Sequence, residues 1–366
     1  MHSEESFGIP KGSTVLVTGV NGFIGSHVCS QLLQLGFDVR GTVRDRTKYA
    51  WVEDLMEKES HRASFTLVSL PDLEEEGAFD PLVKDVSAVI HVASSVSLSP
   101  DPESVIPSSI TGAMNALKAA NRSPSVKRFV LTSSSVAAAL PKPDQKGDEI
   151  TTTSWNIESV AVAWGKPHPH QAWHVYAASK IEAERTVWKF YNQDKSCRPD
   201  LVVNTGKYTA RRIETVEQTK TDLSIVLPGC NFGRSLDVVN QGHPSTSSFI
   251  ESLWYGINMD RLACSPPQQF VDVEDTARLH VACAVLPEVH GERIFAWAEP
   301  FNFDVVLDVL RRKFPNKHFV ENFHHYQDLS AADKARARAN QLLRRLGRDG
   351  FTSLEESVLN NVDDLP

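Results

Sequence analysis

Short runs of β-branched and aliphatic residues alternate with stretches of helical periodicity in the first half of the chain. Five such runs predict strands over residues 13–18, 38–44, 65–70, 88–92 and 128–132. From Phe23 to Leu35 the apolar residues recur at helical spacing, and Gly36 ends that helix. Strands separated by helix-length segments are typical of βαβ units, and strands that are apolar throughout are typical of sheets covered on both faces. The pattern predicts an α/β fold with a doubly wound parallel sheet.

The character of the chain changes after residue 240, where Pro, Gly, Ser and Trp become frequent between helical stretches. We predict a larger domain over residues 10–240 and a smaller, mixed substrate-binding lobe over residues 241–366, with contributions from residues 135–175. Ligands of doubly wound folds bind at the carboxyl edge of the sheet, so we expect the lobe to cover that edge. The Arg-rich stretch 334–348 is interpreted as a solvated amphipathic helix rather than a nucleic-acid or membrane patch.

Composition narrows the classes of function. The 366 residues carry 38 Lys plus Arg against 46 Asp plus Glu, a formal charge of −8, whereas nucleic-acid-binding proteins usually carry a basic excess. No apolar run reaches the length of about 18 residues that spans a bilayer, and we expect no secretory signal in the acidic N-terminus. The five cysteines are scattered and form no CxxC pair, as expected of reduced thiols in a cytoplasmic protein.

A glycine-rich turn follows the first predicted strand and opens the first predicted helix. Its candidate cofactor-binding residues are Gly19, Asn21, Gly22, Phe23, Ile24 and Gly25. Glycines at GxxGxxG spacing permit the tight turn, the close approach of a pyrophosphate and helix–strand packing, while the helix N-terminus supplies free N–H groups to the phosphates. The strand–turn–helix context favours a Rossmann-type dinucleotide site over a purely structural glycine-rich turn.

The second predicted strand ends where such a domain reads the 2′ position of the adenine ribose. Arg44 stands there, followed by Asp45 and Lys48. A carboxylate at this position accepts a hydrogen bond from a free 2′-OH, whereas a guanidinium binds a 2′-phosphate. Arg44, assisted by Lys48, therefore favours NADPH/NADP+ as the cofactor. The alternative is a surface arginine paired with Asp45.

Tyr176 and Lys180 stand at i and i+4, on one face of a predicted helix that continues through Glu184 and Trp188. A neighbouring ammonium favours the phenolate, so we expect Lys180 to lower the pKa of Tyr176. Tyr176 can then give its proton to a carbonyl oxygen as hydride reaches the carbon.

A hydroxyl group at the carboxyl end of the fifth strand can hydrogen-bond the developing alkoxide. Ser133, Ser134 and Ser135 all follow that strand and compete for the role.

Together these residues resemble the extended short-chain dehydrogenase/reductase superfamily in its dihydroflavonol-reductase-like branch, and most of all its fungal NADPH-dependent aldehyde and ketone reductases. The resemblance covers residues 13–310 outside one insertion. It is carried by the glycine turn, by Tyr-Ala-Ala-Ser-Lys over 176–180, and by the segments 43–45, 71–73, 77–80, 91–94, 227–228, 231–233 and 270–275. It implies a Rossmann-type NADP-binding domain and an oxidoreductase that acts on CH–OH and C=O groups.

The resemblance also implies roles for single residues. Ser134 would be the catalytic serine beside Tyr176 and Lys180, and Asp72 and Leu73 would face the adenine. The implied cofactor-binding set further contains Val92, Ala93, Ser94, Thr132, Ser133, Tyr176, Lys180 and Pro228. The implied substrate-binding set is Ser95, Val96, Ser134, Tyr176 and Trp173. Two weaker implications are that Ser245 and Ser247 close over the phosphates, and that Asn115 is either a proton-relay residue or a helix-surface asparagine.

Three histidines invite a metal interpretation. His168, His170 and His174 lie in a Pro-containing segment that offers no helix face and no partner carboxylate. We therefore expect no metal site.

One stretch interrupts the sixth predicted strand. Residues 201–205 read as its start and residues 225–228 as its end, whereas residues 206–224 are polar, charged and not apolar-periodic. Deleting residues 206–225 restores Val-Asn-Thr-Val-Leu-Pro, the form that the resemblance implies. Gly206-Lys207-Tyr208 can be encoded with GTAAGT, the usual start of a fungal intron, and Ile225-Val226 with a terminal AG. We hypothesise that residues 206–225 translate an unspliced intron; the alternative is a genuine insertion, in which an out-of-phase return of the strand would misplace Pro228.

The function that follows is NADPH-dependent reduction of aldehydes or ketones to alcohols, with a small-molecule carbonyl as substrate and no nucleic-acid or membrane partner, in a monomer or homodimer. A hydroxysteroid dehydrogenase or a sugar-nucleotide epimerase of the same superfamily is the alternative among enzymes. An NADP-binding protein that is catalytically inert because of the insertion is the alternative outside them.

Overall fold

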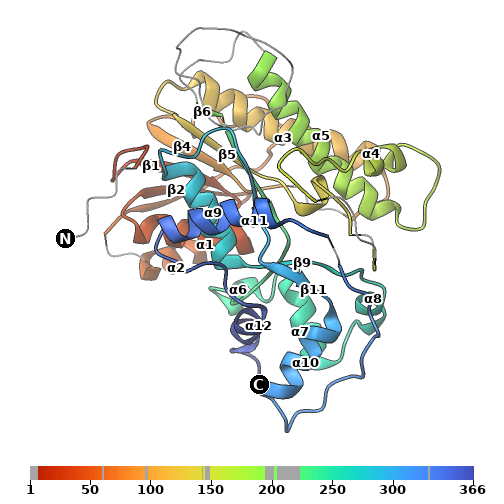
Figure 1. Cartoon of the computed structure of the whole chain (residues 1–366). Coiled ribbons are helices and arrows are strands. Elements are labelled where there is room, and N and C mark those ends of the chain that lie inside the picture. The colour runs from red at the N-terminus through yellow and green to blue at the C-terminus, as the bar shows by residue number, and fades with distance from the viewer. Residues whose placement is uncertain are drawn as a thin grey trace.

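In the computed structural model, the described residues are 7–59, 62–94, 98–141, 143–144, 149–193, 202–203, 223–328 and 330–366 (Figure 1). A parallel sheet crosses the larger part of the molecule in the order β10-β7-β5-β4-β1-β2-β3, and β6 pairs with β5. Its strands are β1 (Thr14–Thr18), β2 (Asp38–Val43), β3 (Phe65–Ser69), β4 (Val86–His91), β5 (Arg128–Thr132), β6 (Val202–Val203), β7 (Leu223–Pro228) and β10 (Arg293–Ala296). The five predicted strands are present, with ends within two residues of the predicted bounds.

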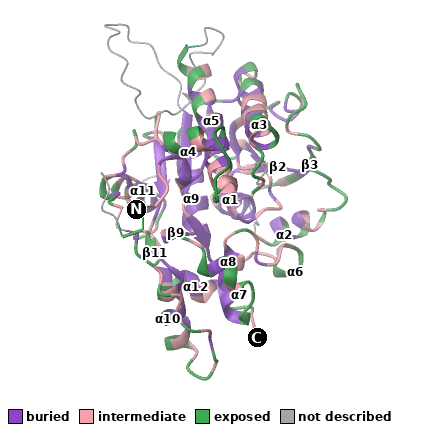
Figure 2. Ribbon diagram, turned by 90° about the vertical axis from the view of Figure 1, so that its right-hand side faces the viewer, coloured by how far each residue is buried: buried purple, intermediate pink, exposed green. Residues whose placement is uncertain are grey.

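Helices cover both faces of this sheet, which confirms the doubly wound prediction. One face carries α1 (Phe23–Gln34), α2 (Trp51–Glu59), α9 (Val273–Val285) and α11 (Asp333–Arg345), and the other carries α3 (Pro102–Arg122) and α5 (Gln171–Gln193), with α4 (Ile157–Ala163) against α5. Val15 and Val17 of β1 pack with α1 and α9, whereas Leu16 between them packs with α3. Figure 2 shows buried residues along the central strands, whereas β3 at the edge of the sheet has one buried residue, Leu67.

A smaller unit lies below this sheet in Figure 1. Its mixed sheet joins β8 (Cys230–Phe232) in parallel and β11 (Glu299–Phe301) in antiparallel to β9 (Gln268–Asp272). Its helices are α6 (Val238–Gln241), α7 (Ser247–Tyr255), α8 (Met259–Ala263), α10 (Phe303–Lys313) and α12 (Leu354–Val362). The unit has a hydrophobic core of its own, rich in phenylalanine.

The chain passes between the two units more than once, unlike the single division predicted at residue 240. After β9, helix α9 and strand β10 return to the large sheet, and α11 packs against both of them. The local hydrophobic pattern does not reveal this return, because α9, β10 and α11 are amphipathic or apolar like the elements of the smaller unit.

Helix α11 holds the Arg-rich stretch that was predicted to be a solvated amphipathic helix. Leu342 and Leu343 are buried against the large sheet, and most of the basic side chains pair with carboxylates. The Arg338–Glu292 and Arg345–Glu288 pairs each measure 2.6 Å. The amphipathic interpretation is confirmed, since these charges are balanced locally. The described residues contain no helix long and apolar enough to cross a membrane.

The sixth strand of the prediction corresponds to two strands beside β5. Val202 of β6 pairs with Arg128, and Val226 of β7 pairs with Thr132. The two β5 residues are four positions apart, whereas their partners are twenty-four apart, an excess of twenty residues. That excess equals the length of 206–225. The chain therefore re-enters the sheet in phase, and Pro228 keeps its place opposite Ala296 of β10.

Candidate active site

The turn between β1 and α1 borders a cavity of about 410 Å³. Gly19 has φ +71°, and a Cβ at Gly25 would lie 2.2 Å from the Gly19 carbonyl oxygen, so both positions require glycine. Gly22 is the N-cap of α1 and provides no side-chain cap, which leaves the first N–H groups of the helix open to a ligand. The cavity is lined by Gly19, Asn21, Gly22, Phe23, Ile24, Gly25, Thr42, Val43, Arg44, Tyr49, Leu70, Leu73, Val92, Ala93, Ser94, Asn231 and Ser245.

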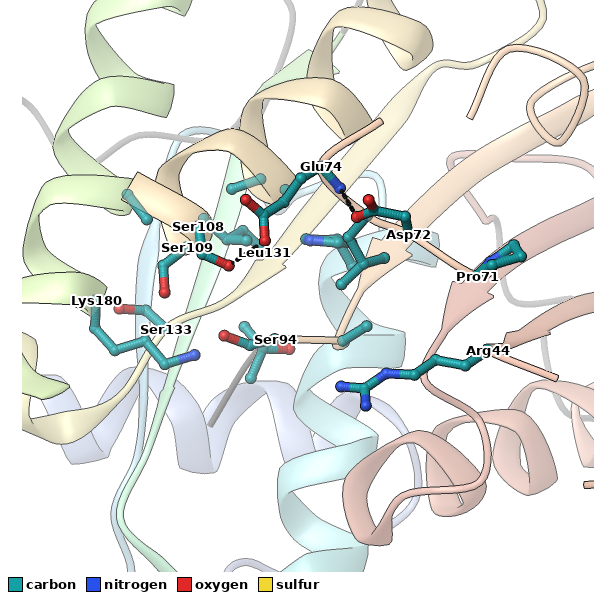
Figure 3. A pocket seen from close by; sticks show the side chains of 17 residues that line it. Arg44, Pro71, Asp72, Glu74, Ser94, Ser108, Ser109, Leu131, Ser133 and Lys180 are labelled. Atoms are coloured by element: carbon teal, nitrogen blue, oxygen red, sulfur yellow. Dashed lines mark hydrogen bonds between the residues drawn. The ribbon is translucent and has the colours of Figure 1, made fainter. Parts of the chain in front are cut away.

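A second cavity of about 260 Å³ continues the first toward α5. The two are contiguous because they share Arg44, Leu73, Ala93 and Ser94. Figure 3 shows Arg44 at one end of this cavity and Lys180 at the other, with Ser94 between them. The remaining predicted residues that line it are Asp72, Thr132 and Ser133. Together the cavities form an elongated cleft along the carboxyl ends of β1, β2, β4 and β5, as predicted.

Arg44 extends into this cleft (Figure 3). The alternative of a surface pair with Asp45 is wrong, because the Asp45 carboxylate accepts instead from the backbone N–H groups of Thr47 and Lys48. Within the described ranges the Arg44 side chain has no ion pair, so its charge is available to a ligand. Lys48 lies over the Tyr49 ring, 5.5 Å from its centroid, and lines neither cavity.

The loop that carries Asp72 and Leu73 is fixed from helix α3. The Nδ2 of Asn115 donates to the carbonyl oxygens of Leu73 at 3.1 Å and of Glu74 at 2.9 Å. This places Asn115 behind the wall of the cleft as a support for that loop, a role that differs from both sequence interpretations.

The three competing serines are separated by their contacts. The Ser134 hydroxyl lies close enough to Tyr176 to lower the pKa of its phenol. The Ser133 hydroxyl donates to Glu184 at 2.9 Å, and Ser135 begins the short 3-10 helix η1 (Ser135–Ala137). Tyr176, Lys180 and Glu184 all lie on α5, as predicted, and the Nζ of Lys180 is 5.9 Å from the Tyr176 ring centroid.

Burial shifts the pKa values of both Tyr176 and Lys180. Desolvation raises the pKa of Tyr176, and the nearby Ser134 hydroxyl, which can donate a hydrogen bond to the phenolate, opposes that rise. Desolvation lowers the pKa of Lys180 to about 8. The expectation that Lys180 lowers the pKa of Tyr176 is therefore wrong, because burial of the phenol outweighs any effect of the ammonium. Tyr176 is held in the protonated form that a general acid needs.

The structure describes only part of the predicted substrate-binding set. Trp173 is partly buried, with its ring 6.4 Å from that of Tyr176 in an edge-to-face arrangement. Ser95 and Val96 lie outside the described residues. Pro228 is buried at the end of β7 and lines neither cavity, and Ser247 is buried, with its hydroxyl bonded to the Pro244 carbonyl oxygen. Ser245, by contrast, lines the larger cavity with φ +58°.

The imidazole rings of the three histidines lie close together. His168 lies 4.9 Å from His174 and 5.8 Å from His170 between ring centroids. The Nδ1 of His174 hydrogen-bonds the Ser159 hydroxyl at 3.0 Å. In the part of the chain that the structure describes, these and other side chains make no group of three or more metal ligands.

Two residues that contribute to the cleft, Thr18 and Tyr49, were not predicted from the sequence. The Thr18 hydroxyl oxygen accepts from the backbone N–H groups of Val92 and Ala93, at 3.0 and 2.9 Å, and so holds the turn after β4. Tyr49 lines the larger cavity. Thr18 could have been predicted, because it ends a predicted strand at the ligand-binding edge of the sheet. Tyr49 could not, because it lies in a turn without a periodic pattern.

Comparisons with known proteins show the family to which the chain belongs. The sequence model of the NAD dependent epimerase/dehydratase family matches residues 15–294. "Aldehyde reductase 2" of Sporidiobolus salmonicolor is 38% identical over 97% of this chain and 96% of its own length. "Ketoreductase adrE" of Penicillium rubens is 36% identical over 97% of each chain.

Solved structures show the same fold. Gre2 of Candida albicans in complex with NADPH superposes with a TM-score of 0.72 at 23% identity, covering 96% of this chain and 98% of that one. A reductase structure described as SsCR_L211H superposes with a TM-score of 0.69 at 25% identity, with the same coverage.

Proposed function

The chain belongs to the NAD dependent epimerase/dehydratase family, and we propose that within it this protein is an NADPH-dependent reductase of aldehydes or ketones. The observation that carries the proposal is the cleft itself, which runs from Arg44, without an ion pair among the described residues, to Lys180. Lys180 stands one helical turn after Tyr176 on α5, and the Ser134 hydroxyl acts on Tyr176. The names of the aldehyde reductase and ketoreductase relatives support the same reaction class.

The cleft fits a phosphorylated dinucleotide. The open N-terminus of α1 and the glycines of its turn suit a pyrophosphate. Arg44 suits a 2′-phosphate, because a guanidinium forms charge-assisted hydrogen bonds with phosphate oxygens. The loop of Asp72 and Leu73, held by Asn115, would face the adenine.

When bound, NADPH supplies the hydride, and the side chains supply the rest of the reaction. Tyr176 would hold its proton, since its pKa is raised, and deliver it to the carbonyl oxygen. Ser134 would hydrogen-bond that oxygen as negative charge develops. Lys180 would hold the nicotinamide ribose at the inner end of the cleft, where Figure 3 shows its side chain.

The proposal is tested by following NADPH consumption by the purified chain against a panel of aldehydes and ketones. We expect turnover with NADPH and at least tenfold less with NADH. NADPH binding without turnover on any carbonyl, in a preparation of verified fold, would instead favour an inert cofactor-binding protein.

A sugar-nucleotide epimerase is the second candidate in the family. It would keep its cofactor bound through the catalytic cycle and would favour a carboxylate at the position of Arg44. The presence of Arg44 in the cleft counts against it. Turnover of uridine diphosphate sugars in the same panel would reverse that judgement, and turnover of steroid ketones alone would point to a hydroxysteroid dehydrogenase.

A further inference from the structure

A buried ion pair lies directly behind the candidate catalytic residues. Glu184 of α5 and Arg293 of β10 are 0% and 2% exposed, and the Nε of Arg293 donates to Oε1 of Glu184 at 2.6 Å. Burying two charges is costly unless both are fully hydrogen-bonded. Such a pair in the interior of the larger unit therefore calls for an explanation beyond stability.

The carboxylate of Glu184 has a second partner at the active site. Its Oε2 accepts from the Ser133 hydroxyl at 2.9 Å. Ser133 is the residue before Ser134, whose own hydroxyl acts on the pKa of Tyr176. Glu184 stands two helical turns after Tyr176 on α5. The carboxylate thus ties the strand end that carries Ser134 to the helix that carries Tyr176.

The guanidinium of Arg293 extends the connection. Its Nη1 donates to the carbonyl oxygens of Thr152 at 3.0 Å and Ser154 at 2.6 Å, and it lies over the Trp155 ring, 4.1 Å from the centroid. Asn156, next in the chain, donates from Nδ2 to the carbonyl oxygen of Val136 in η1 at 2.9 Å.

Two hydrogen-bonded routes from the ion pair therefore converge on Ser134. One reaches the preceding residue, Ser133, through Glu184. The other reaches the helix that follows, η1, through Arg293 and the segment 152–156. The Ser134 carbonyl oxygen also accepts from the Ala137 N–H at 3.0 Å, and together these bonds hold the backbone that carries the Ser134 hydroxyl.

We propose that Glu184, held by Arg293, is a positioning residue that sets the Ser134–Tyr176 geometry through Ser133. The proposal deepens the proposed reductase function and rests on it. Small displacements of reacting groups reduce rates steeply, by as much as about 100-fold for 1 Å. The role predicts a loss in kcat with little change in NADPH affinity, because the cofactor phosphates bind at the far end of the cleft.

The first test variant is Ser133→Ala, which removes the link to Ser134 and leaves the ion pair intact. We expect kcat to fall about tenfold and the Kd for NADPH to change less than about threefold, with Tm almost unchanged, since one hydrogen bond contributes roughly 1 kcal/mol. Wild-type kcat in this variant would overturn the proposal.

The second variant is the double substitution E184L/R293M, which replaces the pair by apolar side chains of similar size. Such replacements often preserve stability. We expect a folded protein whose kcat is at least as low as that of Ser133→Ala. The matched control is Glu292→Gln, which breaks the ion pair between Glu292 and Arg338 one residue away from Arg293 and should keep wild-type kcat. Equal losses in the control and the double variant would show a structural role only and overturn the proposal.

A readout without turnover separates this proposal from the reductase function. Ser134 lowers the pKa of Tyr176, so displacing it should raise that pKa. The ionisation is followed by the ultraviolet absorbance of tyrosinate, taken as the difference from Tyr176→Phe. An upward shift in Ser133→Ala supports the positioning role even if no carbonyl substrate is found, and an unchanged titration contradicts it even if the wild type is active.

Discussion

The two ends of the cleft are built in different ways. At the phosphate end, seven consecutive residues from Gly19 to Gly25 form the turn and the helix start. At the proton-donating end, β5, η1, α5, β10 and the segment 152–156 each contribute one part. The first needs only local backbone geometry, whereas the second needs long-range contacts. A motif in the sequence can therefore reveal the binding end almost completely and the catalytic end only in outline.

The difference also divides the expected effects of substitutions. Changes at the phosphate end should alter cofactor affinity, and changes at the proton-donating end should alter kcat. Each prediction below either separates the two ends further or shows that they act as one.

The largest effect is expected from Tyr176→Phe. Loss of the general acid should lower kcat about 10²- to 10⁴-fold, while NADPH affinity should change little, because Arg44 and the glycine turn would bind the phosphates at the other end of the cleft. Steady-state kinetics and fluorescence titration with NADPH measure the two quantities. A weakened NADPH affinity as large as the loss in kcat would mean that the two ends are not independent.

Arg44→Ala should weaken cofactor binding and leave kcat almost unchanged, the reverse of Tyr176→Phe. Removing charge-assisted bonds to a 2′-phosphate, each contributing about 1.5–3 kcal/mol, should weaken NADPH binding by roughly 10- to 100-fold and leave NADH binding unchanged. The kcat at saturating NADPH should stay near that of the wild type. Arg46→Ala is the matched control, since Arg46 is exposed and paired with Glu53 outside the cleft. An equal loss for NADH would remove Arg44 from the 2′-phosphate site.

A smaller effect is expected from pH. The pKa of Lys180 is lowered by burial to about 8. If the ammonium is the active form, kcat/KM for reduction is constant below that pKa and falls as pH rises through about 8, up to about tenfold per pH unit above it. Lys180→Arg keeps the cation at every accessible pH, so the alkaline limb should move upward in that variant. A limb that stays in place would assign the titration to another group.

The smallest effect is expected from deleting residues 206–225, which we propose translate an unspliced intron. Deleting these twenty residues removes Leu223–Ile225 of β7, which pair with Phe129–Leu131, but it would place residues 203–205 opposite that segment and leave Val226 opposite Thr132. A chain that lacks them should therefore fold and keep both cofactor affinity and kcat within about threefold of the full chain, or exceed it. Failure of the shortened chain to fold would show a genuine insertion. Sequencing spliced transcripts tests the origin directly, because mature messages that all carry these codons exclude an intron.

Hydrophobic periodicity and local motifs predicted the strands, the first helix, the glycine turn and the Tyr176–Lys180 face of α5. These features depend on neighbours in the sequence, and the structure contains all of them. The availability of Arg44 was predicted as well, although its freedom from Asp45 depended on a turn that uses the Asp45 carboxylate for its own backbone.

The tertiary structure decided what depends on distant partners. It separated Ser134 from Ser133 by placing Glu184 beside only one of them, and it reversed the expected pKa shift of Tyr176 because burial is a property of the folded chain. It returned α9 and β10 to the large sheet and brought Asn115 to the loop of Leu73. Sequence spacing fixes which side chains share a face, whereas desolvation and hydrogen-bond choice are fixed only when segments far apart in the chain meet.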